Sequence, residues 1–449
     1  MSNQNNSHKI NRRDFLKLGG GFAAALAGGS LLRNVLRPDV VSAQTLPPGW
    51  SHGRDYALAA SDGWASMPAA SPQVPPAPAL PYWPDDLAPS PFNVYTFGFR
   101  NVTSLHQANR LDLIFNQKEK AQIAAPLLVM DEQQETFLTL YNLGLALRPD
   151  LIDAHTVHFH GFKNAIPMYD GEPSSSVAVP IGRNLTYVYR PRDPGMYMYH
   201  CHFEDTEHVQ MGMTGPVFIR PAQNQGTGSV PAGKYAYNDG DGSTAYDREF
   251  VVFLSEIWAF AHWCDSHIQL PEWTDYRPDF YLLNGRAYPD TLAAPGGGID
   301  PTTGDLIAPA GRPELQYQPV SSVFMCEPGE KVLLRFANLG YTYQSMTVSG
   351  LRLRVIAKDA TLLRGLTAGG RTGADLSFET NTISIGPGEG VEAIFSAPST
   401  PGTYLLYNRN SQQQSNAGGP GYGGQMAQIV VVPAGTLLPQ DEPHTNPLA

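Results

Sequence analysis

One short stretch in the middle of the chain contains a cysteine between two histidines. Cys201 is flanked by His200 and His202, and His208 and Met213 follow a few residues later. A blue copper ion is held by two histidines and one cysteine in a trigonal plane, with a methionine bound weakly along the axis. The stretch therefore predicts a type 1 copper centre that takes one further histidine from another segment.

The further histidine is expected from an upstream segment, residues 155–161, with the sequence HTVHFHG. Both segments have the character of β-strands, in which alternate side chains share a face. His158 and His160 would then point away from Phe159, and Cys201 would point away from its two flanking histidines. This alternation predicts two copper sites on opposite sides of one strand, joined through Cys201.

At these residues the chain resembles the multicopper oxidases. The upstream segment matches the HxxHxH motif of that family, and residues 200–213 match its HCH…H…M motif. The gap from Cys201 to His208 is longer than in the usual laccase motif. The resemblance extends from about residue 92 to residue 432 as a two-cupredoxin chain. It implies copper as the cofactor, a small molecule or metal ion as electron donor, and dioxygen as electron acceptor.

The resemblance also implies a role for each candidate ligand. The type 1 copper would be held by His155, Cys201 and His208, with Met213 as axial ligand and Met211 as its competitor. The remaining histidines would hold a trinuclear oxygen-reducing cluster: His158 at type 2 copper, and His160, His200 and His202 at type 3 copper. In the family, the other half of this cluster's ligands come from another cupredoxin domain, in the same chain or in a neighbouring subunit.

The whole chain predicts an all-β fold of two cupredoxin-like Greek-key β-sandwich domains. Short alternating stretches such as residues 136–141 and 185–190 are separated by turn residues, which favours antiparallel sandwiches. We expect the copper-binding domain 1 at residues 92–220 and domain 2 at residues 249–436. A chain of 449 residues has room for two such domains.

Domain 2 repeats the plan of domain 1 without its ligands. Matching Gly350 to Gly161 places Gln344, Thr347 and Ser349 where His155, His158 and His160 stand. Matching the Pro-Gly pairs places Tyr407, Asn408 and Arg409 at the positions of the His-Cys-His triplet. We therefore expect domain 2 to be structural, or to shape the site of a neighbour. A homo-oligomer of this chain would not complete the family's cluster through domain 2.

The first 43 residues have the pattern of a twin-arginine signal peptide. Arg12 and Arg13 precede a weakly apolar run at residues 18–32 and a small-residue cleavage site at residues 41–43. The alternative is an uncleaved membrane anchor. Export predicts a periplasmic or secreted protein.

Three further segments are expected to connect or extend the domains. Residues 44–91 are rich in proline and predict an extended arm, residues 221–248 a linker, and residues 437–449 a tail. Export permits a disulfide between Cys264 and Cys326, if the fold brings them together. The triplet His262, Cys264 and His267 is a weak additional metal motif.

Charge and motifs together leave several functional interpretations. A formal net charge of −11 argues against a nucleic-acid partner. The first interpretation is a multicopper oxidase with an altered oxygen site. The alternatives are an electron-transfer blue-copper protein, one subunit of a heteromer whose partner cupredoxin subunit brings the missing histidines, and, less favoured, a copper nitrite reductase. By analogy with two-domain relatives, a homo-oligomer would be a trimer.

Overall fold

The computed structural model of the protein describes residues 46–68, 85–419 and 421–449. The expected signal peptide at residues 1–43 lies outside the described residues. Residues Ser51–Ala449 form one compact unit, which contains all the strands and helices described below. Within the described residues, no helix is both long enough and apolar enough for a membrane span.

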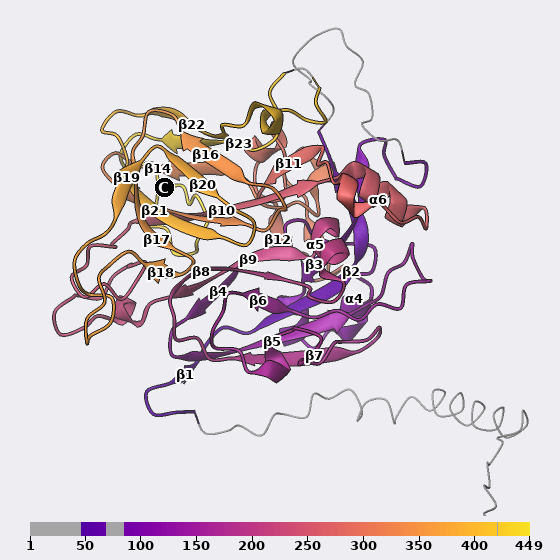
Figure 1. Ribbon diagram of the computed structural model, residues 1–449, viewed down its shortest axis with the longest axis horizontal. Helices are drawn as coiled ribbons and strands as arrows, with labels where there is room; N and C mark the ends of the chain where they lie inside the picture. Colours follow the sequence, from indigo (N-terminus) through magenta and orange to yellow (C-terminus); the bar gives the residue numbers. More distant parts are fainter. Residues whose placement is uncertain (1–45, 69–84, 420) are drawn as a thin grey trace, which may run out of the picture. The chain divides into compact units, whose positions relative to one another are not determined.

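Domain 1 consists of two packed sheets (Figure 1). The first sheet has the order β1 (Ser51–His52), β5 (Gln134–Asn142), β2 (Tyr56–Ser66) and β3 (Asn93–Asn101), and β7 (Asn184–Tyr189) also pairs with β5. The other sheet has the order β4 (Leu128–Asp131), β9 (Thr214–Arg220), β8 (Gly195–His200) and β6 (His158–His160). Both sheets supply apolar side chains to one buried cluster, which includes Phe97, Leu138 and Phe159.

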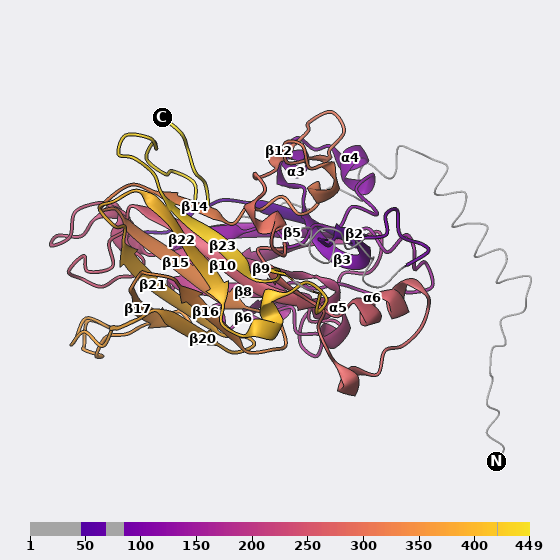
Figure 2. The same ribbon diagram turned by 90° about the horizontal axis from the view of Figure 1, so that it is seen from above.

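Domain 2 has the same two-sheet plan (Figure 2). One sheet has the order β11 (Phe280–Leu283), β10 (Arg248–Ile257), β15 (Lys331–Asn338), β21 (Gly390–Ser396), β17 (Leu353–Lys358) and β18 (Thr361–Leu362), with β19 (Phe378–Thr380) paired to β17. The other has the order β14 (Val323–Cys326), β23 (Met426–Val431), β22 (Gly402–Asn408), β16 (Gln344–Val348) and β20 (Thr382–Ile385). The order β14-β23-β22-β16 repeats β4-β9-β8-β6 of domain 1.

The strand register shows how closely the domains correspond. His158 of β6 pairs with His200 of β8, and Thr347 of β16 pairs with Tyr407 of β22. These are the positions that the internal alignment of the sequence matches. The sheets are mixed rather than purely antiparallel, because β2 runs parallel to β5 and β10 runs parallel to β15. The expectation of antiparallel sandwiches was wrong in this respect.

The expected arm at residues 44–91 is wrong for its central part. β2 is an eleven-residue strand between β3 and β5, and Ala57, Leu58 and Ala60 are at most 1% exposed. Small side chains such as alanine fill a crowded sheet interior without long apolar residues. Domain 1 therefore begins at β1, well before residue 92, and β2 occupies the position that β10 occupies in domain 2.

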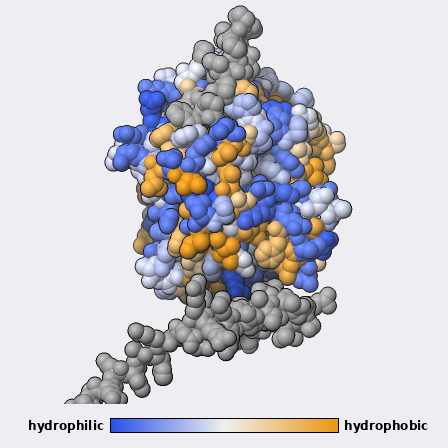
Figure 3. Space-filling view, turned by 90° about the vertical axis from the view of Figure 1, so that its right-hand side faces the viewer, coloured by the Kyte–Doolittle hydropathy of each residue, from blue (hydrophilic) through white to orange (hydrophobic). Residues whose placement is uncertain are grey.

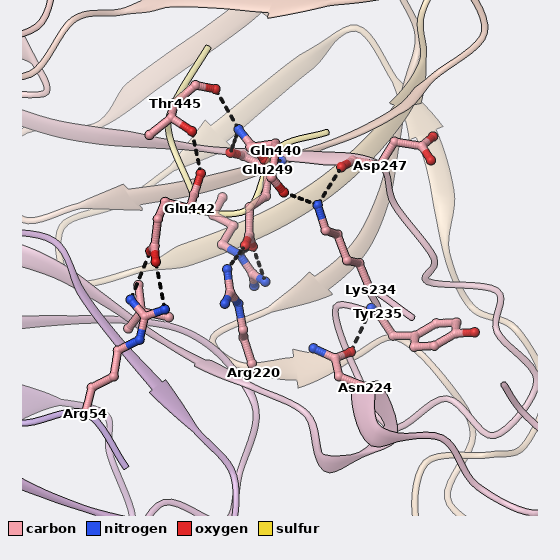
Figure 4. A network of polar contacts seen from close by, with 12 residues as sticks. Arg54, Arg220, Asn224, Lys234, Tyr235, Asp247, Glu249, Gln440, Glu442 and Thr445 are labelled. Carbon is pink, nitrogen blue, oxygen red and sulfur yellow. Dashed lines mark hydrogen bonds and ion pairs between the residues drawn. The ribbon is translucent and has the colours of Figure 1, made fainter. Parts of the chain in front are cut away.

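The expected linker and tail both pack against the domains. Ala236 and Tyr237 of the linker are buried in a cluster with Leu333 and Ile394 of domain 2. In the tail, Glu442 accepts two hydrogen bonds from Arg54 of domain 1, each 2.9 Å long (Figure 4). The side chain of Gln440 bonds both the N–H and the carbonyl of Glu249. The tail is therefore a strap across the two domains.

The helices are short and lie outside the sheets. They are α3 (Thr103–Gln107), α4 (Leu111–Phe115), α5 (Asp205–Met211) and α6 (Ala259–Ser266). A small hairpin adds β12 (Gly297–Ile299) and β13 (Leu306–Ile307). Six 3₁₀ turns complete the described elements: Pro167–Tyr169, Ala222–Gln225, Trp273–Asp275, Asp290–Leu292, Pro313–Leu315 and Ser411–Gln414. α5 matters most for function, because it carries His208.

Candidate metal centres

Cys201 lies directly after β8 and is completely buried. Its backbone N–H donates to the carbonyl of Met213 at 3.1 Å, which continues the pairing of β8 with β9. The N–H of Thr156 lies 3.5 Å from the sulfur and donates to it. The sulfur is therefore held in the core of domain 1 by two neighbouring segments.

Two histidines turn the same ring atom toward this sulfur. His208 Nδ1 lies 3.3 Å from Cys201 Sγ, and His155 Nδ1 lies 3.8 Å from it. Both imidazoles are completely buried, and neither Nε2 has a hydrogen-bond partner in the structure. The longer gap between Cys201 and His208 is accommodated by α5, which begins after Glu204 in a left-handed conformation (φ +48°). The three residues form the group that a trigonal copper site requires.

Met213 lies in the short connection between α5 and β9. Its N–H donates to the carbonyl of His208 at 2.9 Å, and its side chain is completely buried in the hydrophobic cluster that contains Cys201. Met211 is buried in that cluster as well. Both methionines are thus beside the predicted centre, and the motif spacing favours Met213 as the axial ligand.

The charges around this centre favour a cation. Burial lowers the pKa of His155 well below its ordinary value, so this imidazole stays neutral, as a metal ligand must be. Burial also lowers the pKa of His208, but the Cys201 thiolate and the Asp153 carboxylate outweigh it and raise this pKa to about 10. A proton on His208 compensates the negative charge of the groups beside it. A copper ion would compensate the same negative charge, so the donor set fits copper.

Four other histidines gather on the opposite side of β8. The ring centroid of His158 lies 5.3 Å from that of His200, 4.9 Å from that of His202 and 6.2 Å from that of His160. The pairing of His158 with His200 across β6 and β8 brings these rings together. Phe159 points the other way, into the core. This second histidine cluster is what strand alternation predicts.

Backbone carbonyls orient two of these rings. His158 Nδ1 donates to the carbonyl of Asp170 at 2.6 Å, and His200 Nδ1 donates to the carbonyl of Cys201 at 2.9 Å. Each bond leaves Nε2 available for a metal, which is the usual arrangement for a histidine ligand. Burial lowers the pKa of His158 and of His160, and it lowers the pKa of His200 to about 3. His158, His160 and His200 therefore offer neutral imidazoles at neutral pH.

Domain 2 covers one side of this cluster. A cavity of about 420 Å³ is lined by His160 and His200 on one wall and by residues 339–341 and 387–388 of domain 2 on the other. A side chain on Gly388 would place its Cβ 2.8 Å from His160 Nε2, so the backbone of domain 2 approaches the ring closely. The domain 2 residues that line this cavity include no histidine.

In domain 2, amides occupy the place that corresponds to the type 1 centre. Asn408 Nδ2 lies 2.6 Å from the side-chain oxygens of Gln344 and Gln413, and 2.7 Å from that of Gln425. All four side chains are buried. Gln344 and Asn408 are the residues that the internal alignment matches to His155 and Cys201. Hydrogen bonds between amides thus fill the site that copper would fill in domain 1.

Two carboxylates near the centres were missed in the sequence. Asp153 Oδ2 lies 3.7 Å from His208 Nε2, is buried without a hydrogen-bond partner, and forms a group with Glu204. Asp170 Oδ1 lies 3.6 Å from His158 Nδ1. Both residues are close in sequence to the histidine motif. Their contact with the ligands depends on loop conformations that no local pattern specifies.

The structure answers two questions that the sequence left open, the weak metal motif at residues 262–267 and the disulfide between Cys264 and Cys326. His262 Nδ1 bonds the carbonyl of Tyr95, while His267 pairs with Asp86 at 2.8 Å and stacks on Trp263. These histidines and Cys264 therefore do not share one centre. Cys264 and Cys326 are both free, buried thiols, so the disulfide does not form.

Comparison with protein families gives two matches, both described as multicopper oxidase. One model matches residues 100–223 and the other matches residues 250–429. Laccase-7 of Oryza sativa subsp. japonica is 24% identical over 262 residues, which are 56% of this chain and 36% of the relative. Laccase abr2 of Aspergillus fumigatus is 31% identical over 106 residues, 23% of this chain and 16% of the relative. The chain thus spans well under half of the length of these curated relatives.

Solved structures show the same fold. A blue copper oxidase from Nitrosomonas europaea superposes with a TM-score of 0.53 at 18% identity, covering 84% of this chain and 85% of that chain. The multicopper oxidase mgLAC superposes with a TM-score of 0.55 at 19% identity, covering 87% and 88%. These likenesses confirm the predicted fold of two cupredoxin-like domains.

Proposed function

Because the chain belongs to the multicopper oxidase family, a family of copper-dependent oxidoreductases, we propose that it oxidises an outer donor and reduces dioxygen. Electrons would enter one at a time at the centre of His155, Cys201, His208 and Met213. They would leave at the second histidine cluster, His158, His160, His200 and His202. Copper, when bound at these sites, supplies the one-electron redox chemistry.

The observation that carries this proposal is the position of Cys201 between the two groups. Its sulfur faces the Nδ1 atoms of His155 and His208, and its peptide neighbours His200 and His202 belong to the second histidine cluster. The carbonyl of Cys201 also accepts the hydrogen bond from His200 Nδ1. A single residue therefore links both groups by a covalent path and by a hydrogen bond.

The acidic residues beside His208 support a cationic donor, such as a metal ion. The His208 ring is completely buried, so a donor meets its surroundings before it meets the ring. Those surroundings are the Asp153 and Glu204 carboxylates, whose oxygens lie within 4.8 Å of a His208 nitrogen. A positively charged donor would be attracted there, whereas an anionic donor would be repelled.

The incomplete second site favours one alternative. The family's trinuclear cluster needs more histidines than the four found here, and the domain 2 wall of the cavity offers none. We therefore keep electron transfer through the type 1 centre as a second candidate function. A partner cupredoxin subunit that supplies the missing ligands would restore the oxidase.

Twin-arginine export to the periplasm or beyond, and a homotrimer, complete the proposal.

Copper content, visible and EPR spectra, and dioxygen consumption test this proposal on the chain purified alone. We expect a blue band, additional copper beyond one per chain, and dioxygen uptake with a reduced donor. His158→Ala should keep the blue band and abolish the uptake, because it removes a ligand of the second site only. His52→Ala is the matched control, since that histidine is exposed and contacts Asp55 and the Phe137 ring, away from both candidate metal groups. One copper per chain without uptake would favour electron transfer, and uptake unchanged in His158→Ala would refute the role of the second site.

A further inference from the structure

A basic cavity lies at the junction of the two domains. Its volume is about 350 Å³, and its lining comes from domain 1, the linker and domain 2. Three of its lining side chains are cationic, Lys163, Arg192 and Arg371, and one is acidic, Asp193. The whole chain carries a formal charge of −11, so this concentration of positive charge runs against the overall trend. Such local fields attract oppositely charged ligands.

The acidic lining residue is already engaged. Asn164 Nδ2 donates to Asp193 Oδ2 at 3.2 Å, and the Asn164 side-chain oxygen accepts the N–H of Arg192 at 2.9 Å. These contacts hold the segment that precedes β8 against the loop that follows β6. The cationic side chains of this wall therefore project from a braced backbone.

The domain 2 wall is braced as well. Arg371 lies at the tip of a hairpin in which Thr367 N–H donates to the carbonyl of Gly370 at 2.7 Å. Arg371 Nη1 donates to the carbonyl of Arg364 at 3.2 Å, a neutral acceptor that leaves its charge uncompensated. Arg364 in turn bonds Asp241 of the linker at 2.6 Å. The hairpin that presents Arg371 is thus fastened at its base.

The cavity is separate from the metal centres. Lys163 follows β6 and Arg192 precedes β8, at the end of this strand pair that lies away from Cys201. Met198, which pairs with His160, lies three residues from Gly195, a rise of roughly 10 Å at the usual strand spacing. None of the four histidines of the second cluster lines the cavity.

We propose that this cavity binds a small polyanion, a molecule with two or more phosphate or carboxylate groups. Lys163 from domain 1 and Arg371 from domain 2 suit a ligand with at least two negative charges, because each charge-assisted hydrogen bond needs its own anionic oxygen. The volume lies at the lower end of the range for small-molecule sites. Such a ligand contacts both domain 1 and domain 2. Its affinity for the cavity falls as the salt concentration rises.

Isothermal titration calorimetry with pyrophosphate and with citrate, at constant ionic strength, tests the proposal on the full chain. We expect saturable binding of at least one of them, weakened at least tenfold by Arg371→Gln and abolished by the double change Lys163→Gln and Arg371→Gln. Both side chains are exposed, so the fold should persist, which circular dichroism checks. Arg352→Gln is the matched control, because its side chain is 69% exposed and lies outside the cavity.

The titration distinguishes the class of ligand that the cavity binds. Binding of pyrophosphate alone assigns a phosphate ligand, binding of citrate alone assigns a carboxylate ligand, and binding of both assigns a general polyanion site. No saturable binding of either, or binding unchanged in the double variant, overturns the proposal. The measurement needs no electron transfer, so it stands or falls independently of the oxidase activity.

Discussion

At the scale of single residues, the protein depends on side chains whose surroundings set their charge. Cys201 is buried between two imidazoles, and the buried Oδ2 atom of Asp153 lies 3.7 Å from His208 Nε2 without a hydrogen-bond partner. A buried carboxylate of this kind is costly unless positive charge compensates it. The predicted type 1 centre therefore interacts electrostatically with the Asp153 and Glu204 carboxylates beside His208, which are called the acidic cap below.

Replacing the thiolate tests the type 1 centre. Cys201→Ser should abolish the blue band completely, because the colour requires a copper–thiolate bond, while the fold should persist since the change is nearly isosteric. Visible absorption and circular dichroism measure the two effects. Cys264→Ser is the control, because this thiol is also buried but lies away from the centre. A blue band that survives in Cys201→Ser would contradict the assignment.

Removing the acidic cap tests the proposed donor. We expect Asp153→Asn to lower kcat/KM for a cationic donor about tenfold, equivalent to about 1.4 kcal/mol, because it removes one negative charge from the entry point. The value for a neutral donor should change less. Steady-state kinetics with both donors measures the difference. Glu379→Gln, an exposed change in domain 2, controls for overall charge. Equal losses for both donors would argue against charge recognition.

At the scale of elements, turns place the ligands that strands alone do not orient. The Asp170 carbonyl reaches His158 because Gly171 turns the chain with φ +79°. A Cβ at Gly171 would lie 2.3 Å from the carbonyl oxygen of Val157. The turn and the histidine strand are therefore in direct backbone contact, and only glycine fits between them.

Two glycine substitutions separate crowding from backbone strain. Gly171→Ala should lower the melting temperature strongly and reduce copper bound at the second site, since the turn must move away from β6. Gly182 has a similar φ of +72° with open space around its Cβ, so Gly182→Ala should cost only about 1 kcal/mol. Thermal unfolding and copper analysis compare the two. Equal behaviour of the two variants would show that the close contact is unimportant.

At the scale of the whole molecule, the C-terminal strap ties the chain's end to both domains. His444 within it is half-buried, accepts the N–H of Val251 through Nδ1 at 3.1 Å, and donates from Nε2 to the carbonyl of Ser321 at 2.8 Å. Burial lowers its pKa to about 4, despite the bond to Ser321. Arg54 and Glu442 fasten the same strap to domain 1 (Figure 4).

The lowered pKa of His444 makes stability depend on pH. Its folded pKa lies below its unfolded value of about 6.5, so the unfolded chain binds the proton more readily. The neutral His444 adds about 3 kcal/mol to the free energy of unfolding. This contribution is complete above pH 6.5 and is lost as the pH falls toward 4. Denaturant unfolding at pH 7 and pH 4.5 should therefore differ less in His444→Gln than in the unchanged protein. His52→Gln, at an exposed site, should leave the difference unaltered.

The surface of the whole molecule also bears on its partners. Figure 3 shows hydrophobic patches among hydrophilic side chains on the face at the right of Figure 1. Ile152, next to Asp153, is 83% exposed, and Leu270 is 92% exposed. The exposed Ile152 side chain is therefore adjacent in sequence to the Asp153 carboxylate that faces His208.

The sequence by itself determined the fold class, the internal repeat and the candidate ligands. Strand alternation and turn residues are local, and the combination of one cysteine with six histidines and two methionines allows few metals. The structure pairs His158 with His200 and Thr347 with Tyr407, which agrees with the internal alignment of the two halves. Local sequence patterns were enough to predict those features that arise from interactions between residues close together along the chain.

The tertiary structure decided what depends on distant segments. The alanine-rich β2 is buried because β3 and β5 flank it, although its composition resembles that of an arm. Asp153 faces His208, and the amides of domain 2 satisfy one another, only because loops and strands far apart in sequence converge. Burial and charge compensation arise from packing among such segments. They are therefore properties of the folded chain, which no local stretch of sequence contains.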